Sequence, residues 1–145
     1  MQIAYQNTQR LQTLTVQDLI WINLVVTGSV NSFDYETLEQ ATFRQFGYGG
    51  AQDVLGQAAG VLESIVRRRP FSVGNKRTAL LACGAFLAMN GMEFLASPED
   101  AQSLIECATG SARERLASVT QPDPDWQPVL VPDVHGTVTR LAERY

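Results

Sequence analysis

The sequence predicts an all-α fold, a compact helical bundle built around one buried helix that carries a candidate site at its N-terminus. Helix-start and helix-stop residues recur along the chain, and the apolar residues between them follow helical spacing. One stretch, 79–89, is apolar nearly all round, which is typical of a helix at the centre of a bundle. Strand-like alternation of polar and apolar residues is scarce, so the pattern favours helices over a sheet.

Capping residues and glycines bound the first two predicted helices. Thr15 and Asp18 have the spacing of a capping box, with Asp in place of the usual Glu. The apolar face that follows ends at Gly28. A second helix is predicted over about 34–46. It stops at 47–50, because three glycines in four residues resist helix formation.

The third and fourth predicted helices are separated by a very short loop. The third runs over about 53–68 and ends there because Pro70 pushes the residue before it out of helical geometry. The fourth runs over about 75–90, where Gly91 supplies the C-terminal stop. This fourth helix contains the apolar stretch, so we expect it to be the central one.

The remaining predicted elements are shorter. Residues 92–95 are expected to be extended, and Ser97 as N-cap opens a helix that ends near residue 110. A short helix over 111–119 and a proline-rich, non-helical connector over 122–128 follow, and the tail from 132 to 145 has the pattern of a last helix. We divide the chain into a main domain, 1–120, and a C-terminal extension, 121–145, that packs on it or trails from it.

Composition narrows the function classes. A chain of 145 residues has the size of one domain, and its net charge of −4 gives no reason to expect nucleic-acid or membrane binding. Cys83 and Cys107 match no metal or redox spacing, which favours a reducing, cytoplasmic setting. The first ten residues lack the apolar stretch of a signal peptide.

The segment 69–78 is the most informative part of the chain. Five of the eleven basic residues fall between residues 67 and 77. A helix that begins just after a glycine exposes unpaired N–H groups and the positive end of its dipole, which favours a phosphate group. The predicted phosphate-binding residues are Gly74, Asn75, Lys76 and Arg77. We expect Phe71 to turn inward and anchor the loop.

Residues 69–80 closely resemble the signature of the Fic/Doc family, in particular its death-on-curing (Doc) branch. That signature reads roughly His-x-Phe-x-Asp/Asn-Ala/Gly-Asn-Lys-Arg-Thr-Ala-Leu. The residues that match it in register are Phe71, Gly74, Asn75, Lys76, Arg77, Thr78, Ala79 and Leu80. The resemblance extends over about residues 11–112. Within it, Tyr48, Gly49 and Gly50 are similar to the family's flap region.

The resemblance implies a small all-α fold and a site for the phosphates of ATP or a related nucleotide. Fic members transfer AMP, or another phosphate-containing group, to a protein hydroxyl. Doc members phosphorylate a translation elongation factor and act as toxins that a partner antitoxin holds in check. Lys76 after Asn75, and Leu80 in place of the second Fic arginine, both favour the Doc branch.

Two residues depart from the signature. Arg69 stands where the family has its catalytic His, the general base, and arginine stays protonated in proteins. Val73 stands where the family has an acidic residue, usually a Mg²⁺ contact, and its isopropyl group offers no oxygen ligand. We therefore expect no metal ligand from this chain and weakened or absent Mg²⁺ binding, while the anion-binding residues remain.

Three functional hypotheses follow. The first is a Doc-like, toxin-family protein that keeps a phosphate or nucleotide site and is impaired in catalysis. The second is an active enzyme, either a Doc-type phosphotransferase (kinase) or a Fic-type nucleotidyltransferase, that modifies a translation factor. The third is a non-catalytic module that binds an antitoxin. His135, the only histidine, is expected to be an exposed surface residue in a loop-like context rather than a replacement base.

Overall fold

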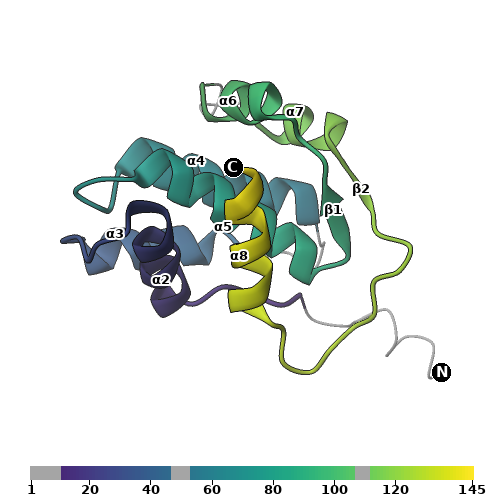
Figure 1. Ribbon diagram of the computed structural model, residues 1–145, viewed down its shortest axis with the longest axis horizontal. Helices are drawn as coiled ribbons and strands as arrows, with labels where there is room; N and C mark the ends of the chain where they lie inside the picture. The colour runs from purple at the N-terminus through teal and green to yellow at the C-terminus, as the bar shows by residue number, and fades with distance from the viewer. Residues whose placement is uncertain (1–10, 47–52, 107–111) are drawn as a thin grey trace.

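The computed structural model describes residues 11–46, 53–106 and 112–145. These parts of the chain form seven helices and one two-stranded sheet (Figure 1). The elements in chain order are α2 (Val16–Thr27), α3 (Tyr35–Phe43), α4 (Val54–Arg68), α5 (Asn75–Met89), β1 (Met92–Phe94), α6 (Pro98–Glu106), α7 (Ala112–Ser118), β2 (Thr120–Pro122) and α8 (Val134–Arg144). The prediction of an all-α fold is confirmed.

Helix α5 is the centre of the molecule, and α4, α2 and α8 pack around it. Twelve of its fifteen residues are buried, which agrees with the nearly all-apolar stretch in the sequence. Burial raises the pKa of the Cys83 thiol to about 12, so this cysteine is a core residue with no nucleophilic character at neutral pH. No helix of the described ranges is long and apolar enough to cross a membrane.

Helix α8, drawn in yellow in Figure 1, lies across α5 and also contacts α2. Its buried residues are Val138 and Leu141. A close approach to α5 is possible because position 84 is a glycine. A Cβ atom there would come within 3.2 Å of a Leu141 methyl carbon and 3.4 Å of the Phe94 ring. The end of the chain therefore contributes to the same core as the rest.

The starts of α2, α3 and α4 lie where the sequence placed them. Thr15 and Asp18 form a complete capping box at the start of α2, and Gly28 ends that helix in the left-handed conformation. Asp34 caps α3. Asp53 caps α4 and also forms a bidentate ion pair with Arg113 at 2.9 Å, which joins α4 to α7. These signals are local, which is why sequence alone could identify them.

Two predicted elements differ from those observed. The second helix ends at Phe43 rather than Phe46, and hydrogen-bonded turns follow it. The proline-rich connector begins in a strand, since β2 pairs antiparallel with β1 and places Pro122 opposite Met92. The predicted helix that Ser97 opens, α6, is described only as far as Glu106, so its predicted end near residue 110 falls outside the described residues.

Candidate anion-binding site

The turn between α4 and α5 begins with a backbone conformation that side chains rarely adopt. Arg69 follows the last residue of α4 with φ 50° and ψ 63°, in the left-handed region. Within the described residues it is the one non-glycine residue with positive φ. Pro70 explains part of this geometry, because it disfavours the right-handed helical region for the residue before it. The chain therefore turns sharply at the end of α4, and Arg69 is the residue at which it turns.

Phe71 fixes the middle of the turn. Its side chain is 4 % exposed, and its main chain forms an antiparallel bridge with Phe33. Beside that bridge, the main-chain N–H of Asp34 donates to the Pro70 carbonyl at 2.9 Å. The side-chain amide of Asn75 completes the attachment: its Nδ2 donates to the Phe71 carbonyl at 2.7 Å, and its Oδ1 accepts from the Phe71 N–H at 2.9 Å.

Asn75 therefore has a different role from the one expected. We expected its side-chain amide to be a donor to a bound anion. In the structure both polar atoms of that amide are engaged by Phe71, and the residue is 6 % exposed. A buried amide whose donor and acceptor are both hydrogen-bonded holds the loop in place and has no polar atom left for a ligand. The group that Asn75 leaves available to an anion is thus its main-chain N–H.

A polar network from α2 supports the loop from beneath. Asn23 is 2 % exposed, and its Nδ2 donates to the Val73 carbonyl at 2.9 Å and to the Thr78 hydroxyl at 3.1 Å. The Asn23 Oδ1 in turn accepts from the Asn31 amide at 2.9 Å. Sequence analysis missed this network. The one available signal was a polar residue, Asn23, in the middle of an apolar helical run.

Gly74 is required for both its conformation and its small size. It caps α5 at φ 83°, and a Cβ atom there would lie 2.5 Å from Thr27 Cγ2 and 3.1 Å from Asn23 Nδ2. No side chain caps α5 at this end. Among the described residues, no partner is found for the main-chain N–H groups of 75–77. These groups and the helix dipole are available to an anion.

A hollow of about 460 Å³ opens over this helix start. Its volume falls within the range of about 300–1,000 Å³ that is usual for ligand sites. Three cations and the loop main chain surround it, and no carboxylate or imidazole occurs among the described residues that line it. Those residues are Val66, Arg69, Ser72, Val73, Gly74, Asn75, Lys76 and Arg77. The lining is therefore positively charged and has no side chain that could take up a proton at neutral pH.

The two cations at the start of α5 differ in their contacts. The Arg77 guanidinium donates to three main-chain oxygens, those of Val26, Ala142 and Tyr145, at 3.1, 3.3 and 2.9 Å. It therefore ties the ends of α2 and α8 to α5. Lys76 is exposed, and no hydrogen bond from its ammonium group is found among the described residues. Of this pair, Lys76 is the more available to a ligand.

A family comparison covers this region. The model of the Fic/DOC family matches residues 14–87, which is half of the chain and includes every residue that lines the hollow. The chain belongs to the Fic/DOC family. A search of curated proteins and a search of solved structures find no match for the chain.

Two other features belong to the Fic/DOC resemblance, namely the flap and the Mg²⁺ contact. The flap residues Tyr48, Gly49 and Gly50 lie outside the described residues. Within the described residues, no group of three or more His, Cys, Asp or Glu side chains could hold a metal ion. The donors at the hollow do not fit Mg²⁺, because its protein ligands are usually carboxylates and the Val73 side chain has no oxygen.

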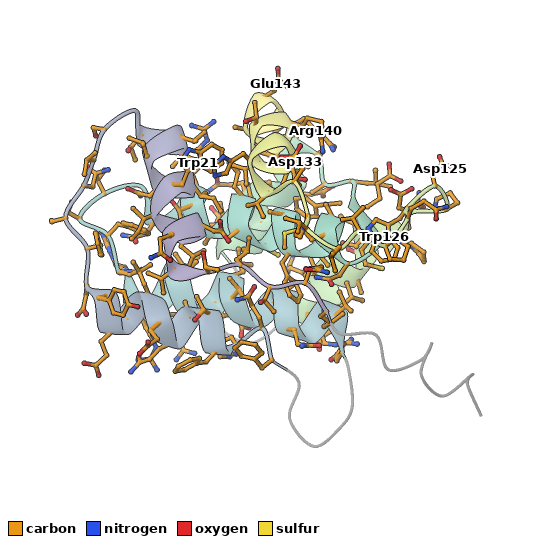
Figure 2. All side chains as sticks on the ribbon, turned by 90° about the horizontal axis from the view of Figure 1, so that it is seen from below. Trp21, Asp125, Trp126, Asp133, Arg140 and Glu143 are labelled. Carbon is orange, nitrogen blue, oxygen red and sulfur yellow. The ribbon has the colours of Figure 1, made fainter. Side chains whose placement is uncertain are left out.

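His135 lies in the first turn of α8 rather than in the loop that we expected for it. It is exposed, and its ring stacks on Trp21 with centroids 3.9 Å apart and planes 18° apart. Figure 2 shows Trp21 on α2 beside the start of α8, near Asp133. The opposite end of α8 contacts Arg77 through Tyr145, ten residues beyond His135, and ten residues of helix span about 15 Å. In this member of the Fic/DOC family, His135 is thus a packing residue remote from the hollow.

Proposed function

We propose that this Fic/DOC family member is a Doc-like protein that binds the phosphates of a nucleotide such as ATP and is impaired in phosphoryl transfer. The observation that carries the proposal is the hollow at the start of α5. There, the main-chain N–H groups of 75–77 and the Lys76 ammonium group face an anion site that contains no proton acceptor.

Phosphate binding is supported by the way the loop is held. The main chain at Val73, Gly74 and Asn75 is fixed by hydrogen bonds from α2 and from within the turn. Donors that are already in place cost little reorganisation when a ligand binds. An anion at a helix start also gains from the helix dipole, and a phosphate carries more charge and more acceptor oxygens than a carboxylate. The nucleotide's phosphates are therefore the best match for this site.

Impaired transfer is supported by the two departures from the signature. Transfer to a hydroxyl needs a base within hydrogen-bond reach, and the position of the family's catalytic His holds Arg69. His135 does not substitute for it, since α8 holds that ring against Trp21. Val73 removes the acidic residue that usually contacts Mg²⁺ in the family. Binding without efficient transfer is the combination that these residues favour.

As a Doc-like protein it would have an antitoxin partner, and its ancestral target would be a translation elongation factor. Both belong to the proposal and rest on the resemblance to the Doc branch. The preserved residues are those of the anion site, and the replaced ones are those of catalysis. A chain of this kind would bind a nucleotide or a partner without modifying a target.

A transfer assay tests the proposal. Radiolabelled ATP is incubated with an elongation factor and either the natural chain or the double variant Arg69→His, Val73→Asp. Regaining a positioned base should raise transfer by about 10²–10⁴-fold. The control is Arg67→His with Val73→Asp, which places the imidazole on the exposed end of α4 and should restore nothing. Robust labelling by the natural chain would refute the impairment.

A further inference from the structure

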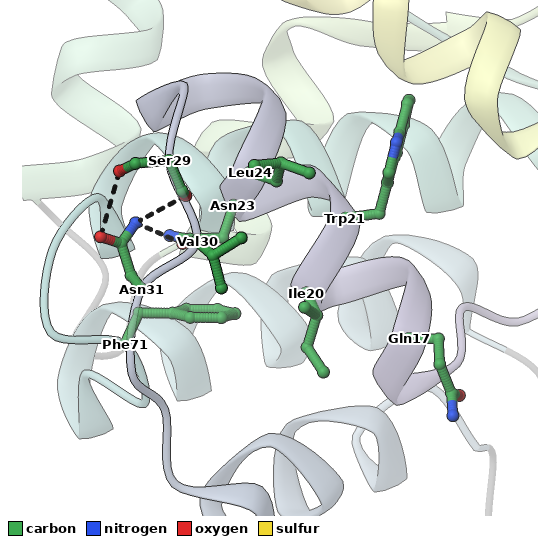
Figure 3. Close-up of a pocket in the computed structure, with 9 residues that line it drawn as sticks. All are labelled: Gln17, Ile20, Trp21, Asn23, Leu24, Ser29, Val30, Asn31 and Phe71. Carbon is green, nitrogen blue, oxygen red and sulfur yellow. Dashed lines mark hydrogen bonds between the residues drawn. The ribbon is translucent and has the colours of Figure 1, made fainter.

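A small apolar pocket of about 200 Å³ lies against α2 and the turn that leads to α3 (Figure 3). Ile20 and Leu24 contribute from α2, and Val30 and the ring of Phe71 contribute from the other side. The surface exposed in the pocket is almost entirely apolar, although four polar side chains also line it: Gln17, Asn23, Ser29 and Asn31. The pocket is separate from the anion-binding hollow, although Phe71 also anchors the loop of that hollow.

The walls of this pocket are held in place. The Asn31 amide donates to Asn23 Oδ1 at 2.9 Å and to Thr27 Oγ1 at 2.8 Å, which fixes the turn that carries Val30. Phe71 is fixed by its paired main chain and is 4 % exposed. The pocket is therefore pre-formed, and a ligand would not have to order it on binding.

The rim of the pocket exposes apolar side chains. Val30 is 84 % exposed and stands between Ser29 and Asn31, in a turn where polar residues are the usual choice. Leu24 is 38 % exposed on the α2 side. Phe33, at 41 % exposed, continues the apolar surface toward α3. Apolar patches with aromatic members are typical of surfaces that bind another protein.

The volume of the pocket favours a single side chain of a partner protein over a small molecule as its occupant. Sites for small molecules usually measure about 300–1,000 Å³, and a pocket of about 200 Å³ is smaller than that range. A single apolar side chain of a partner polypeptide needs less room. Such anchors, seated in a pocket near the centre of an interface, provide much of the binding energy in protein complexes.

The charge of this part of the chain indicates the chemistry of the partner. Residues 11–43, which include α2, the turn and α3, contain neither Lys nor Arg. They contain four acidic residues: Asp18, Asp34, Glu36 and Glu39. The cations that contact these elements are held by hydrogen bonds, since Arg77 donates to the Val26 carbonyl and Arg68 donates to Gln40. The segment 11–43 itself is negatively charged and favours a ligand of the opposite charge.

We propose that the α2–α3 turn is a docking site for a basic, amphipathic segment of a partner protein, which inserts one large apolar side chain between Leu24, Val30 and Phe71. The site goes beyond the proposed nucleotide binding and does not depend on it. The acidic residues of 11–43 would pair with Lys or Arg of the segment.

A peptide selection tests this docking site. A random peptide library is selected on the full chain, and the affinity of the enriched peptides is measured for the natural protein and for Val30→Ser. We expect enriched peptides to combine a large apolar residue with Lys or Arg, and Val30→Ser to weaken their binding about tenfold. The matched control is Val131→Ser, because Val131 is also a loop valine and is 80 % exposed. It should leave the affinity unchanged.

Three results would overturn the docking site. They are enrichment of peptides without basic residues, equal affinity for natural protein and Val30→Ser, or an equal loss with Val131→Ser. Sedimentation of the natural chain tests whether a second copy of the same protein occupies the pocket instead. A dimer that Val30→Ser dissociates would assign the pocket to self-association and contradict the proposal. The readouts are peptide binding and mass, so a failure of ATP binding would not affect them.

Discussion

Individual residues at the α4–α5 turn fall into two groups, those available to a ligand and those that hold the loop in place. Lys76 and the N–H groups of 75–77 face the hollow. The side-chain amides of Asn75 and Asn23 instead form hydrogen bonds with the main chain of the loop. The motif positions could be read from the sequence, but this division of roles could not. Asn23 acts on Val73 from fifty residues away, and no local pattern encodes that distance.

The conformation of Arg69 leads to a stability prediction. A non-glycine residue in the left-handed region costs roughly 1–2 kcal/mol, and glycine largely avoids that cost. Arg69→Gly should therefore raise the free energy of unfolding by about 1 kcal/mol, measured by urea denaturation. Arg67→Gly, inside the last turn of α4, should lower it by about 0.5–1 kcal/mol. If both variants are destabilised alike, the strain assigned to Arg69 is absent.

At the scale of elements, helix ends were predictable and element partners were not. The starts of α2, α3 and α4 depend on residues within one turn, so the sequence placed them correctly. The pairing of β2 with β1 was missed because it joins segments thirty residues apart and includes a proline. The contact of α8 with the start of α5 was missed for the same reason, since Arg77 alone gives no sign of it.

Arg77 should stabilise the packing of α8. Arg77→Met keeps much of the side-chain length and removes the donors to three main-chain oxygens from α2 and α8. We expect a loss of about 1–2 kcal/mol in the free energy of unfolding. Hydrogen exchange should be faster in α8 than in α4. Lys76→Met is the control and should leave both unchanged. Equal effects of the two variants would contradict this role of Arg77.

The ion pair between α4 and α7 gives a pH prediction. The hydrogen bond from Arg113 holds the pKa of Asp53 below its ordinary value of 3.8. A lowered carboxyl pKa stabilises the fold above the unfolded-state value, and this gain is lost as pH falls through the folded-state value. Both side chains are about half exposed, so the gain is at most about 1 kcal/mol.

Asp53→Asn keeps an oxygen for the cap and removes the charge. It should cost up to about 1 kcal/mol near pH 7 and less at about pH 2, because the stabilising effect of the lowered carboxyl pKa fades as the pH falls. Urea denaturation at the two pH values measures the difference. A cost that persists undiminished in acid would show that the ion pair is not its source.

At the scale of the whole molecule, a buried central helix mounts the site rigidly. Helix α5 is enclosed by α4, α2 and α8, and its first turn emerges at the hollow. The sequence predicted this arrangement because the apolar stretch 79–89 leaves no polar face for solvent. The acidic residues of 11–43 lie on the flanking elements, so the proposed anion site and the proposed docking site for a basic partner are separate regions of the protein.

The central claim is that the start of α5 binds phosphate. Titrating ATP, and separately inorganic phosphate, into ¹⁵N-labelled protein tests it through the main-chain amide signals. The amides of Gly74, Lys76 and Arg77 should shift together and saturate, and Lys76→Ala should weaken binding of ATP more than Arg68→Ala does, since Arg68 points to Gln40. Unchanged amide signals at residues 74–77, or shifts confined to other parts of the chain, would contradict the account.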